Sequence, residues 1–349
     1  MRQGRAAAAG PAMHVASQRR RWIARALIGG LALLASSAQA QVDDAQRFAQ
    51  VWTAADGHPD VAALDAGYLA PASAGLRAFV PEYIGDAKRL AEAIVRAPAA
   101  YRHALAVCLP DADTVNVVMD EVLTRYGAHM PVPARPAVHL LFGANTSAGT
   151  TLSGAIYIGL EKACEGVADA AAFRTRLQGL LAHELVHVLQ PPMADDARRD
   201  LLAWALREGT ANMVGALVLG QPYTGAQDSW AISREAMLWP RFQQDRQTML
   251  QHWPKGGEPD PQALAAGTRW FWNAGTAEGW PPDLGYWVGQ RIAAQWYQRQ
   301  GQAAGALSQL VGARSPAQVL AQSGYAPDRH APAAASDRQA RGAMGVSAP

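Results

Sequence analysis

Two histidines four residues apart, with a glutamate directly after the first, are the residues of this 349-residue chain best suited to chemistry. In the stretch His183-Glu184-Leu185-Val186-His187, a helix would project both imidazoles from one face, one turn apart. Imidazole nitrogens bind Zn²⁺ at about 2.0–2.1 Å, and this spacing suits a single ion. Glu184 would lie beside that ion and could accept the proton of a metal-bound water. The stretch therefore indicates a metal site with a general base.

Apolar residues surround these three ionisable groups and favour a bound cation over an ordinary polar surface. On a helix they would occupy most of the remaining circumference: Phe173, Leu177, Leu180, Leu181, Leu185, Val186, Val188 and Leu189. Burying two imidazoles and a carboxylate among such side chains is costly unless a cation and water satisfy them. We therefore expect Zn²⁺ as the cofactor.

A third ligand is needed, because a catalytic zinc site uses three protein ligands and leaves one position open for water. Glu208, 21 residues after His187, is the best candidate. The alternative is an exposed helical carboxylate paired with Arg207 or Arg234. Asn212, one helical turn beyond Glu208, is a candidate to hydrogen-bond one of the ligands from outside the coordination shell.

Two helices must position these groups. A helix over about residues 170–190 would carry both histidines and end before Pro191. A second helix over residues 201–219, with Asp200 as a candidate N-cap, would carry Glu208. The short loop between them predicts antiparallel neighbours, which would bring Glu208 opposite the histidines.

The rest of the chain is expected to be mostly helical with a small β-sheet. Residues 43–126 show helical periodicity, and a further helix is expected over about 285–300. Residues 138–142 and 155–160 are predicted as strands. Residues 143–154 are rich in Gly, Thr, Ser and Asn and predict a turn or flap. These elements predict an α+β fold with its sheet beside the metal-binding helix.

Residues 1–40 have the pattern of a secretory signal peptide. Arginines precede a ten-residue apolar run and small residues follow it, so cleavage is expected between Ala40 and Gln41. The run is too short for a membrane span, which needs about 20 apolar residues. Translation starts at Met1 or at Met13, which lies closer to the run. We expect a periplasmic or secreted protein without a membrane anchor after cleavage.

The mature chain is predicted to form a single domain over residues 41–326, in which residues 41–130 are a helical N-terminal part. Residues 327–349, rich in Ala, Pro, Ser and Arg, are expected to be a disordered tail. The two cysteines, Cys108 and Cys164, could form a disulfide or remain two buried thiols. The disulfide and the two free thiols are both compatible with the sequence.

The charge balance disfavours a nucleic-acid partner. Six of the 31 lysines and arginines lie in the first forty residues, which contain no acidic residue. The remaining chain has 25 basic and 29 acidic residues, and therefore a formal charge of about −4. A nucleic-acid-binding domain would have a basic surface instead.

The metal-binding pattern resembles the gluzincin metallopeptidases, in which two histidines lie on one helix and a glutamate on the next. The histidine stretch is followed here by Arg207-Glu208-Gly209-Thr210-Ala211-Asn212. Farther on, Gly285-Tyr286-Trp287-Val288-Gly289 and Ser323-Gly324-Tyr325 resemble a bacterial family of predicted zinc-dependent proteases with exported members. The likeness covers roughly residues 138–325, and more weakly extends back to Val51.

This resemblance implies a zincin-like fold and hydrolysis of peptide bonds by a zinc-activated water. The ligands would be His183, His187 and Glu208, with Glu184 as general base. The partner would be a peptide or protein substrate, and no oligomeric state is predicted. The strand over residues 155–160 would be the edge beside the cleft, where an extended peptide pairs through its main chain.

A gluzincin also needs a second electrophile that stabilises the oxyanion formed at the scissile carbonyl. Tyr286 is the choice here, because its flanking glycines would let a helix start pack close to the metal. A core tyrosine is the alternative for Tyr286, and Tyr223 and His252 are further candidates for the role. The eight tryptophans between Trp230 and Trp296 could line substrate pockets or form a core.

Two other functions fit the same metal site. The metal could be structural, in a non-catalytic envelope module for binding or assembly. Alternatively, the site could catalyse a different hydrolysis, as a metal-dependent amidase that acts on cell-wall material. The apparent set of three ligands favours an open, catalytic site over a closed structural one.

Overall fold

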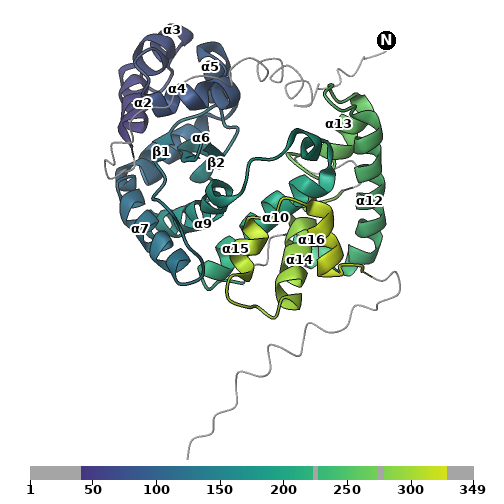
Figure 1. The fold of residues 1–349 in the computed structure, drawn as a ribbon. Helices are drawn as coiled ribbons and strands as arrows, with labels where there is room; N and C mark the ends of the chain where they lie inside the picture. Colours follow the sequence, from purple (N-terminus) through teal and green to yellow (C-terminus); the bar gives the residue numbers. More distant parts are fainter. Residues whose placement is uncertain (1–40, 223–226, 274–278, 328–349) are drawn as a thin grey trace, which may run out of the picture. The chain divides into compact units, whose positions relative to one another are not determined.

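The computed structural model describes residues 41–222, 227–273 and 279–327, which are mostly helical with a three-stranded sheet (Figure 1). The α+β class predicted from the sequence is confirmed at this level. The predicted signal peptide, residues 1–40, and the tail from residue 328 onward lie outside the described residues. Among the helices that are described, none combines the length and the apolar character of a membrane span.

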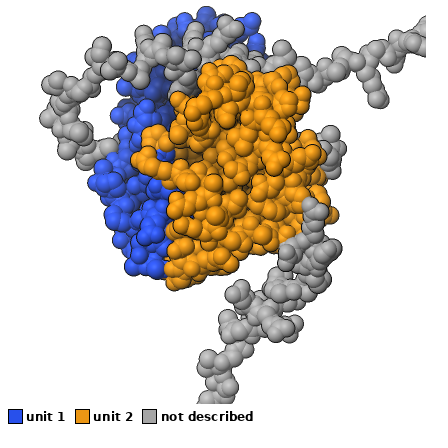
Figure 2. Space-filling view, turned by 45° about the vertical axis from the view of Figure 1, so that its right-hand side comes forward, with its two compact units in different colours: residues 1–191, 211–223, 303–313 blue, residues 192–210, 224–302, 314–349 orange. Residues whose placement is uncertain are grey.

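The described residues fall into two compact units, which Figure 2 distinguishes by colour. Unit 1 takes residues up to 191 together with 211–223 and 303–313, and unit 2 takes 192–210, 224–302 and those from 314 onward. The single domain expected over residues 41–326 stays a prediction.

Unit 1 begins with helical segments, as the periodicity of residues 43–126 predicts. They are α2 (Asp43–Ala54), α3 (Val61–Leu64), η2 (Asp65–Leu69), α4 (Ala74–Phe79), η3 (Val80–Ile84), α5 (Ala87–Arg96), α6 (Pro98–His103), η4 (Ala104–Cys108), η5 (Leu109–Asp111) and α7 (Thr114–Gly127). Buried rings join these helices to the sheet, and those of Phe48 and Phe142 stack with centroids 4.3 Å apart.

The sheet has the strand order β1-β3-β2, with β1 (Val138–Leu141) parallel and β2 (Gly149–Leu152) antiparallel to β3 (Ala155–Gly159). Both predicted strands are present. The turn or flap expected over residues 143–154 is wrong in part, because it contains β2. Ser153 and Gly154 both have positive φ, 50° and 80°, and form the tight turn that pairs β2 with β3.

This strand order also corrects the expected sheet edge. The strand that begins at Ala155 is central, since it pairs with β1 on one side and β2 on the other. The two outer strands are β1 and β2, and β2 is the outer strand that packs against α9. The buried carboxylate of Glu161 accepts main-chain N–H groups of Gly143 and Asn145, each at 3.0 Å, and so fixes the start of the segment leading to β2.

The remaining helices of unit 1 are α8 (Leu160–Ala163), α9 (Ala170–Leu189) and α15 (Ala306–Val311). The α9 helix begins where the Asp169 carboxylate accepts the N–H of Ala172 at 2.9 Å, and ends as Gln190 turns to extended backbone before Pro191. It packs against α7, β2 and β3. Both the start and the end agree with the prediction.

The α10 helix (Leu201–Val218) follows, and its residues after Thr210 belong to unit 1. The Asp200 carboxylate accepts the N–H of Leu202 at 2.9 Å, at the position where a cap was expected. Gly215 lets this helix approach α9, since a Cβ there would lie 3.3 Å from the main chain at Ala182 and His183.

Unit 2 is built from helices. They are the segment of α10 up to Thr210, η6 (Asp195–Arg199), α11 (Asp228–Ala231), η7 (Ile232–Arg234), α12 (Glu235–His252), α13 (Pro261–Thr268), α14 (Leu284–Arg299) and α16 (Pro316–Ser323). The α12 helix packs against α13, and α14 against α16. Trp270 is fully buried, and its indole N–H donates to the Asp245 carboxylate at 2.9 Å, so part of the tryptophan cluster is core.

Candidate metal centre

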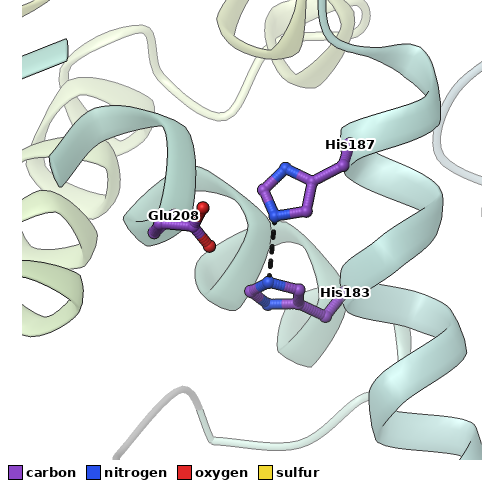
Figure 3. Close-up of side chains that lie close together, drawn as sticks. All are labelled: His183, His187 and Glu208. Carbon is purple, nitrogen blue, oxygen red and sulfur yellow. Dashed lines mark hydrogen bonds between the residues drawn. The ribbon is translucent and has the colours of Figure 1, made fainter. Parts of the chain in front are cut away.

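Two histidines and a glutamate lie together as a possible metal site. His183 and His187 of α9 and Glu208 of α10 each offer one ligand atom, and these atoms all lie within 4.8 Å of one another. Figure 3 shows both imidazoles and the carboxylate pointing toward a common space. All three side chains are half-buried. The structure therefore brings together the three residues expected to be ligands.

The position of the two imidazoles follows from the helix that carries them. The other face of α9 is core: Leu177, Leu181 and Leu185 are fully buried. His183 and His187, four residues apart, project together from the side of the helix that faces away from these leucines. Their rings meet edge to face with centroids 4.8 Å apart.

Each imidazole is oriented by an amide side chain at its Nδ1 atom. His183 Nδ1 lies 2.9 Å from Asn212 Oδ1, and His187 Nδ1 lies 2.8 Å from Gln190 Oε1. An amide oxygen is an acceptor, so each Nδ1 carries the proton and each Nε2 has a lone pair. Asn212 was a candidate for this position, whereas Gln190 was not considered, although it lies one turn beyond His187 at the helix end.

The two Nε2 atoms are the point at which a cation fits. They face each other at 3.1 Å, drawn as a dashed line in Figure 3. Two nitrogens bound to one tetrahedral Zn²⁺ at about 2.05 Å would be about 3.3 Å apart. The two atoms lie at hydrogen-bond distance, and a cation bonded to both would fit between them with little change in their separation. The donor set of two imidazoles and a carboxylate therefore suits Zn²⁺.

The candidate general base lies against the edge strand. Glu184 is 4% exposed, and its Oε2 atom lies 3.0 Å from the hydroxyl of Thr151 on β2. The same hydroxyl is 3.1 Å from the main-chain oxygen of Glu184. A Cβ at Gly149 would come within 2.9 Å of the Glu184 carboxylate, so β2 passes directly over it. No pattern in the sequence singles out Thr151, because its segment was expected to be a turn.

Glycines hold α14 against the segment of α10 that carries Glu208. A Cβ at Gly289 would lie 1.7 Å from the carbonyl oxygen of Ala205, and one at Gly209 would lie 2.0 Å from the main-chain nitrogen of Gln290. The two helix backbones can be this close only because both positions lack side chains. The glycine after Glu208 and the second glycine of the Gly-Tyr-x-x-Gly stretch thus serve one helix contact.

Tyr286 lies in the first turn of this α14 helix, three residues before Gly289. It is half-buried, with its ring centroid 5.5 Å from that of Phe271. Of the other candidates for an oxyanion donor, His252 bonds to the Asp260 carboxylate at 2.8 Å, and Tyr223 lies outside the described residues.

An acidic side chain that the sequence did not single out lies near Glu208 within unit 2. Asp283 immediately precedes α14, and its carboxylate accepts the main-chain N–H of Trp272 at 2.6 Å. Burial, and to a smaller extent the Glu208 carboxylate, raise the pKa of Asp283, whereas hydrogen bonds from the main chain at Trp272 and Asn273 lower it. Its position just before the helix expected from about residue 285 could have marked Asp283 as a candidate cap, but no pattern in the sequence connects it with Glu208.

The arrangement can hold a divalent cation with three protein ligands, and the buried Glu184 follows the first of them in the sequence. Three-ligand sites of imidazole and carboxylate are typical of zinc hydrolases, in which the fourth position is open. The chain matches no protein-family model, no curated protein and no solved structure. The functional conclusion therefore depends on the geometry and chemistry of these residues.

Proposed function

We propose that this protein is a zinc-dependent metallopeptidase with a zincin-like fold. The observation that carries the proposal is the convergence of His183, His187 and Glu208, with the two Nε2 atoms 3.1 Å apart. The amide partners of both Nδ1 atoms support it, because such hydrogen bonds fix the tautomer that binds metal through Nε2.

The reaction would divide its proton transfers between residues of this chain. Zn²⁺, when bound, supplies a Lewis acid that polarises a carbonyl and lowers the pKa of water. Glu184 accepts a proton from the water that attacks the peptide carbonyl, and gives it to the nitrogen of the leaving amine as the C–N bond breaks. One carboxylic acid and one amine result, and Glu184 returns to its starting state. Tyr286 is proposed to donate its hydroxyl proton in a hydrogen bond to the oxyanion.

The edge strand β2 offers a place for an extended substrate. Its residues pair with β3 on one side, and it passes over Glu184 through Gly149 and Thr151. A peptide that adds to this edge would form main-chain hydrogen bonds regardless of its side chains. We therefore assign to β2 the role that the sequence had suggested for the strand at residues 155–160.

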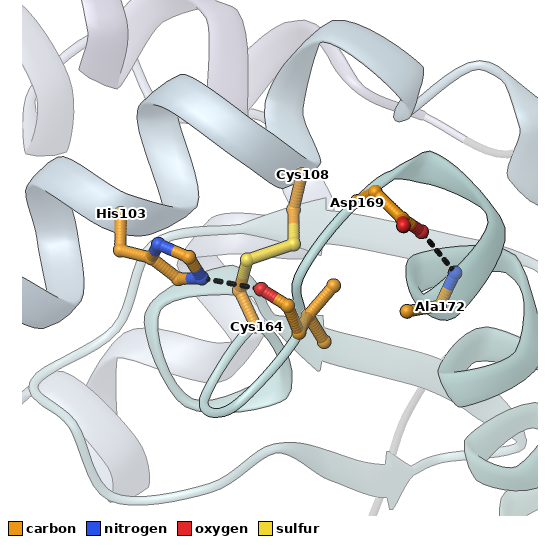
Figure 4. Close-up of a disulfide and its surroundings, with 6 residues drawn as sticks. His103, Cys108, Cys164, Asp169 and Ala172 are labelled. Carbon is orange, nitrogen blue, oxygen red and sulfur yellow. Dashed lines mark hydrogen bonds between the residues drawn. A yellow bond between two sulfur atoms is a disulfide. The ribbon is translucent and has the colours of Figure 1, made fainter.

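A disulfide supports the proposed location in the periplasm or outside the cell. Cys108, at the end of η4, is bonded to Cys164, and both residues are fully buried (Figure 4). Of the two states compatible with the sequence, a disulfide and two thiols, the disulfide is the one present. Disulfides persist mainly in oxidising compartments. Cys164 also lies five residues before Asp169, so the bond tethers the segment that leads into α9.

Removing this disulfide should destabilise unit 1. Replacing both cysteines with alanine is expected to lower the free energy of unfolding by about 2–4 kcal/mol, because the bond closes a long loop in the unfolded chain. The measurement is denaturant unfolding of the variant beside the unchanged protein. Dithiothreitol should weaken the unchanged protein and leave the variant as it is. Equal unfolding midpoints for both proteins would contradict this role.

Zinc-dependent hydrolysis of peptides tests the proposed function directly. The purified protein should contain about one Zn²⁺ per chain, because one three-ligand site is available for it among the described residues. It should cleave denatured casein, lose this activity on chelation, and regain it with one equivalent of Zn²⁺. The measurements are elemental analysis and release of new amino termini.

The two other functions give different results in the same experiment. If the metal is structural, chelation should unfold the protein, which circular dichroism would detect, and the zinc-loaded form should cleave no peptide. A cell-wall amidase predicts cleavage of peptidoglycan fragments with no cleavage of casein. Either result would overturn the peptidase proposal.

A further inference from the structure

One tryptophan of unit 2 departs from the behaviour of a core residue. Trp272 is 56% exposed, and its backbone has a φ of 54°, in the left-handed region. A bulky aromatic residue rarely adopts this conformation, and an exposed indole gains little from burial. Both features reduce stability, and strained positions of this kind cluster at functional sites.

The surrounding structure holds Trp272 in this conformation. The carboxylate of Asp283 accepts its main-chain N–H at 2.6 Å, and Asp283 itself has a φ of 58°. The side chain of the next residue, Asn273, donates to the carbonyl oxygens of Thr268 and Arg269 at 2.9 and 3.1 Å. The exposed indole is therefore presented by a backbone fixed on both sides of it.

This indole forms part of a platform near a proposed metal ligand. Its ring centroid is 5.0 Å from that of Trp204, a half-buried residue of α10. Trp204 precedes Glu208 by four residues, which places it on the same helix face, about 6 Å away along the axis. Phe271, beside Trp272, contacts the ring of Tyr286, the proposed oxyanion donor.

We propose that Trp272 and Trp204 form a subsite that receives an aromatic or large aliphatic side chain of the peptide substrate, next to the scissile bond. This inference rests on the proposed peptidase function and specifies its substrate class. The carboxylate of Asp283, which accepts the main-chain N–H of Trp272, disfavours acidic side chains at this position. Aromatic rings gain from stacking beyond the apolar area they bury.

One substrate side chain suits this platform better than a protein partner. Stable protein–protein interfaces bury about 1,200–2,000 Å² in total, which requires a broad patch. Here a single indole projects from its loop, while the rings beside it, Trp204 and Phe271, are half-buried and fully buried. One exposed ring offers contact area for one side chain and not for a broad interface.

The test is cleavage-site profiling of a peptide mixture from a digested proteome, with the zinc-loaded protein and three variants. Trp272→Ala removes the platform, and Trp272→Phe keeps an aromatic ring. Met237→Ala is a matched control, because Met237 is another exposed apolar residue of unit 2, at 49%. Zinc content and the circular dichroism spectrum of each variant check the metal and the fold.

The unchanged protein should cleave preferentially beside Phe, Tyr, Trp or Leu, and Met237→Ala should keep this preference. In Trp272→Ala, kcat/KM should fall about tenfold for the preferred peptide and less than about twofold for its alanine counterpart. Trp272→Phe should restore most of the difference in kcat/KM between the preferred peptide and its alanine counterpart. If Trp272→Ala keeps the preference, or the unchanged protein has none, the subsite is wrong while the peptidase stands. If the zinc-loaded protein cleaves no peptide, both proposals fail.

Discussion

Replacing Glu184 with glutamine should abolish peptide hydrolysis while the metal stays bound. The amide has the same shape as the carboxylate and can still accept the Thr151 hydroxyl, which lies 3.0 Å from Oε2. It cannot accept a proton from water, so the proton transfers of the reaction lose their carrier. General-base catalysis contributes about 10²–10⁴-fold, and we expect kcat to fall by at least this range. The measurement is peptide cleavage under saturating substrate, beside zinc content.

Glu121→Gln is the matched control for this experiment. Glu121 is a half-buried glutamate of unit 1 on α7, where it pairs with Arg174, and the same substitution there should leave kcat unchanged within a factor of about two. A Glu184→Gln variant with full activity would exclude Glu184 as the general base. Loss of zinc from that variant would instead show that the carboxylate helps to hold the metal.

The second large effect is expected on metal affinity. His183→Ala, His187→Ala and Glu208→Ala should each remove a ligand atom from the cluster in which all three lie within 4.8 Å. Asn212→Ala and Gln190→Ala should weaken zinc binding less, by about 10–100-fold, because these side chains only orient the imidazoles. Competition against a chromophoric chelator measures all five dissociation constants.

The order of these effects distinguishes the ligands from their supports. His129→Ala, which removes an exposed histidine of unit 1, should leave zinc affinity unchanged. If Glu208→Ala binds zinc as tightly as the unchanged protein, the carboxylate belongs to an ordinary surface ion pair and the three-ligand site is wrong. If Asn212→Ala and His183→Ala lose equal affinity, Asn212 is more than a support.

Local sequence patterns were enough to predict the helices that carry the site. The helix expected over residues 170–190 is observed as α9 (Ala170–Leu189), and the helix expected over 201–219 as α10 (Leu201–Val218). Their bounds depend on interactions within a few residues: the Asp169 cap, the Asp200 carboxylate and the prolines after Gln190. The four-residue spacing of His183 and His187 places two imidazoles together on any helix.

Contacts between distant segments decided the rest. The β2 strand was expected to be part of a turn, because four residues of Gly, Thr and Leu become a strand only when a partner strand accepts their hydrogen bonds. The disulfide between Cys108 and Cys164, the oxygen of Asn212 at His183 and the hydroxyl of Thr151 at Glu184 each join residues 29 to 56 positions apart.

Local sequence patterns were therefore enough to select the residues proposed as metal ligands and to predict the helices that carry them. Spacing along a helix is a local property, and it follows from 3.6 residues per turn. Only folding brought the Asn212 amide to His183 Nδ1, β2 over Glu184, and the Asp283 carboxylate to the main-chain N–H of Trp272. These depend on side chains that meet through folding, and no periodicity in the chain records such meetings.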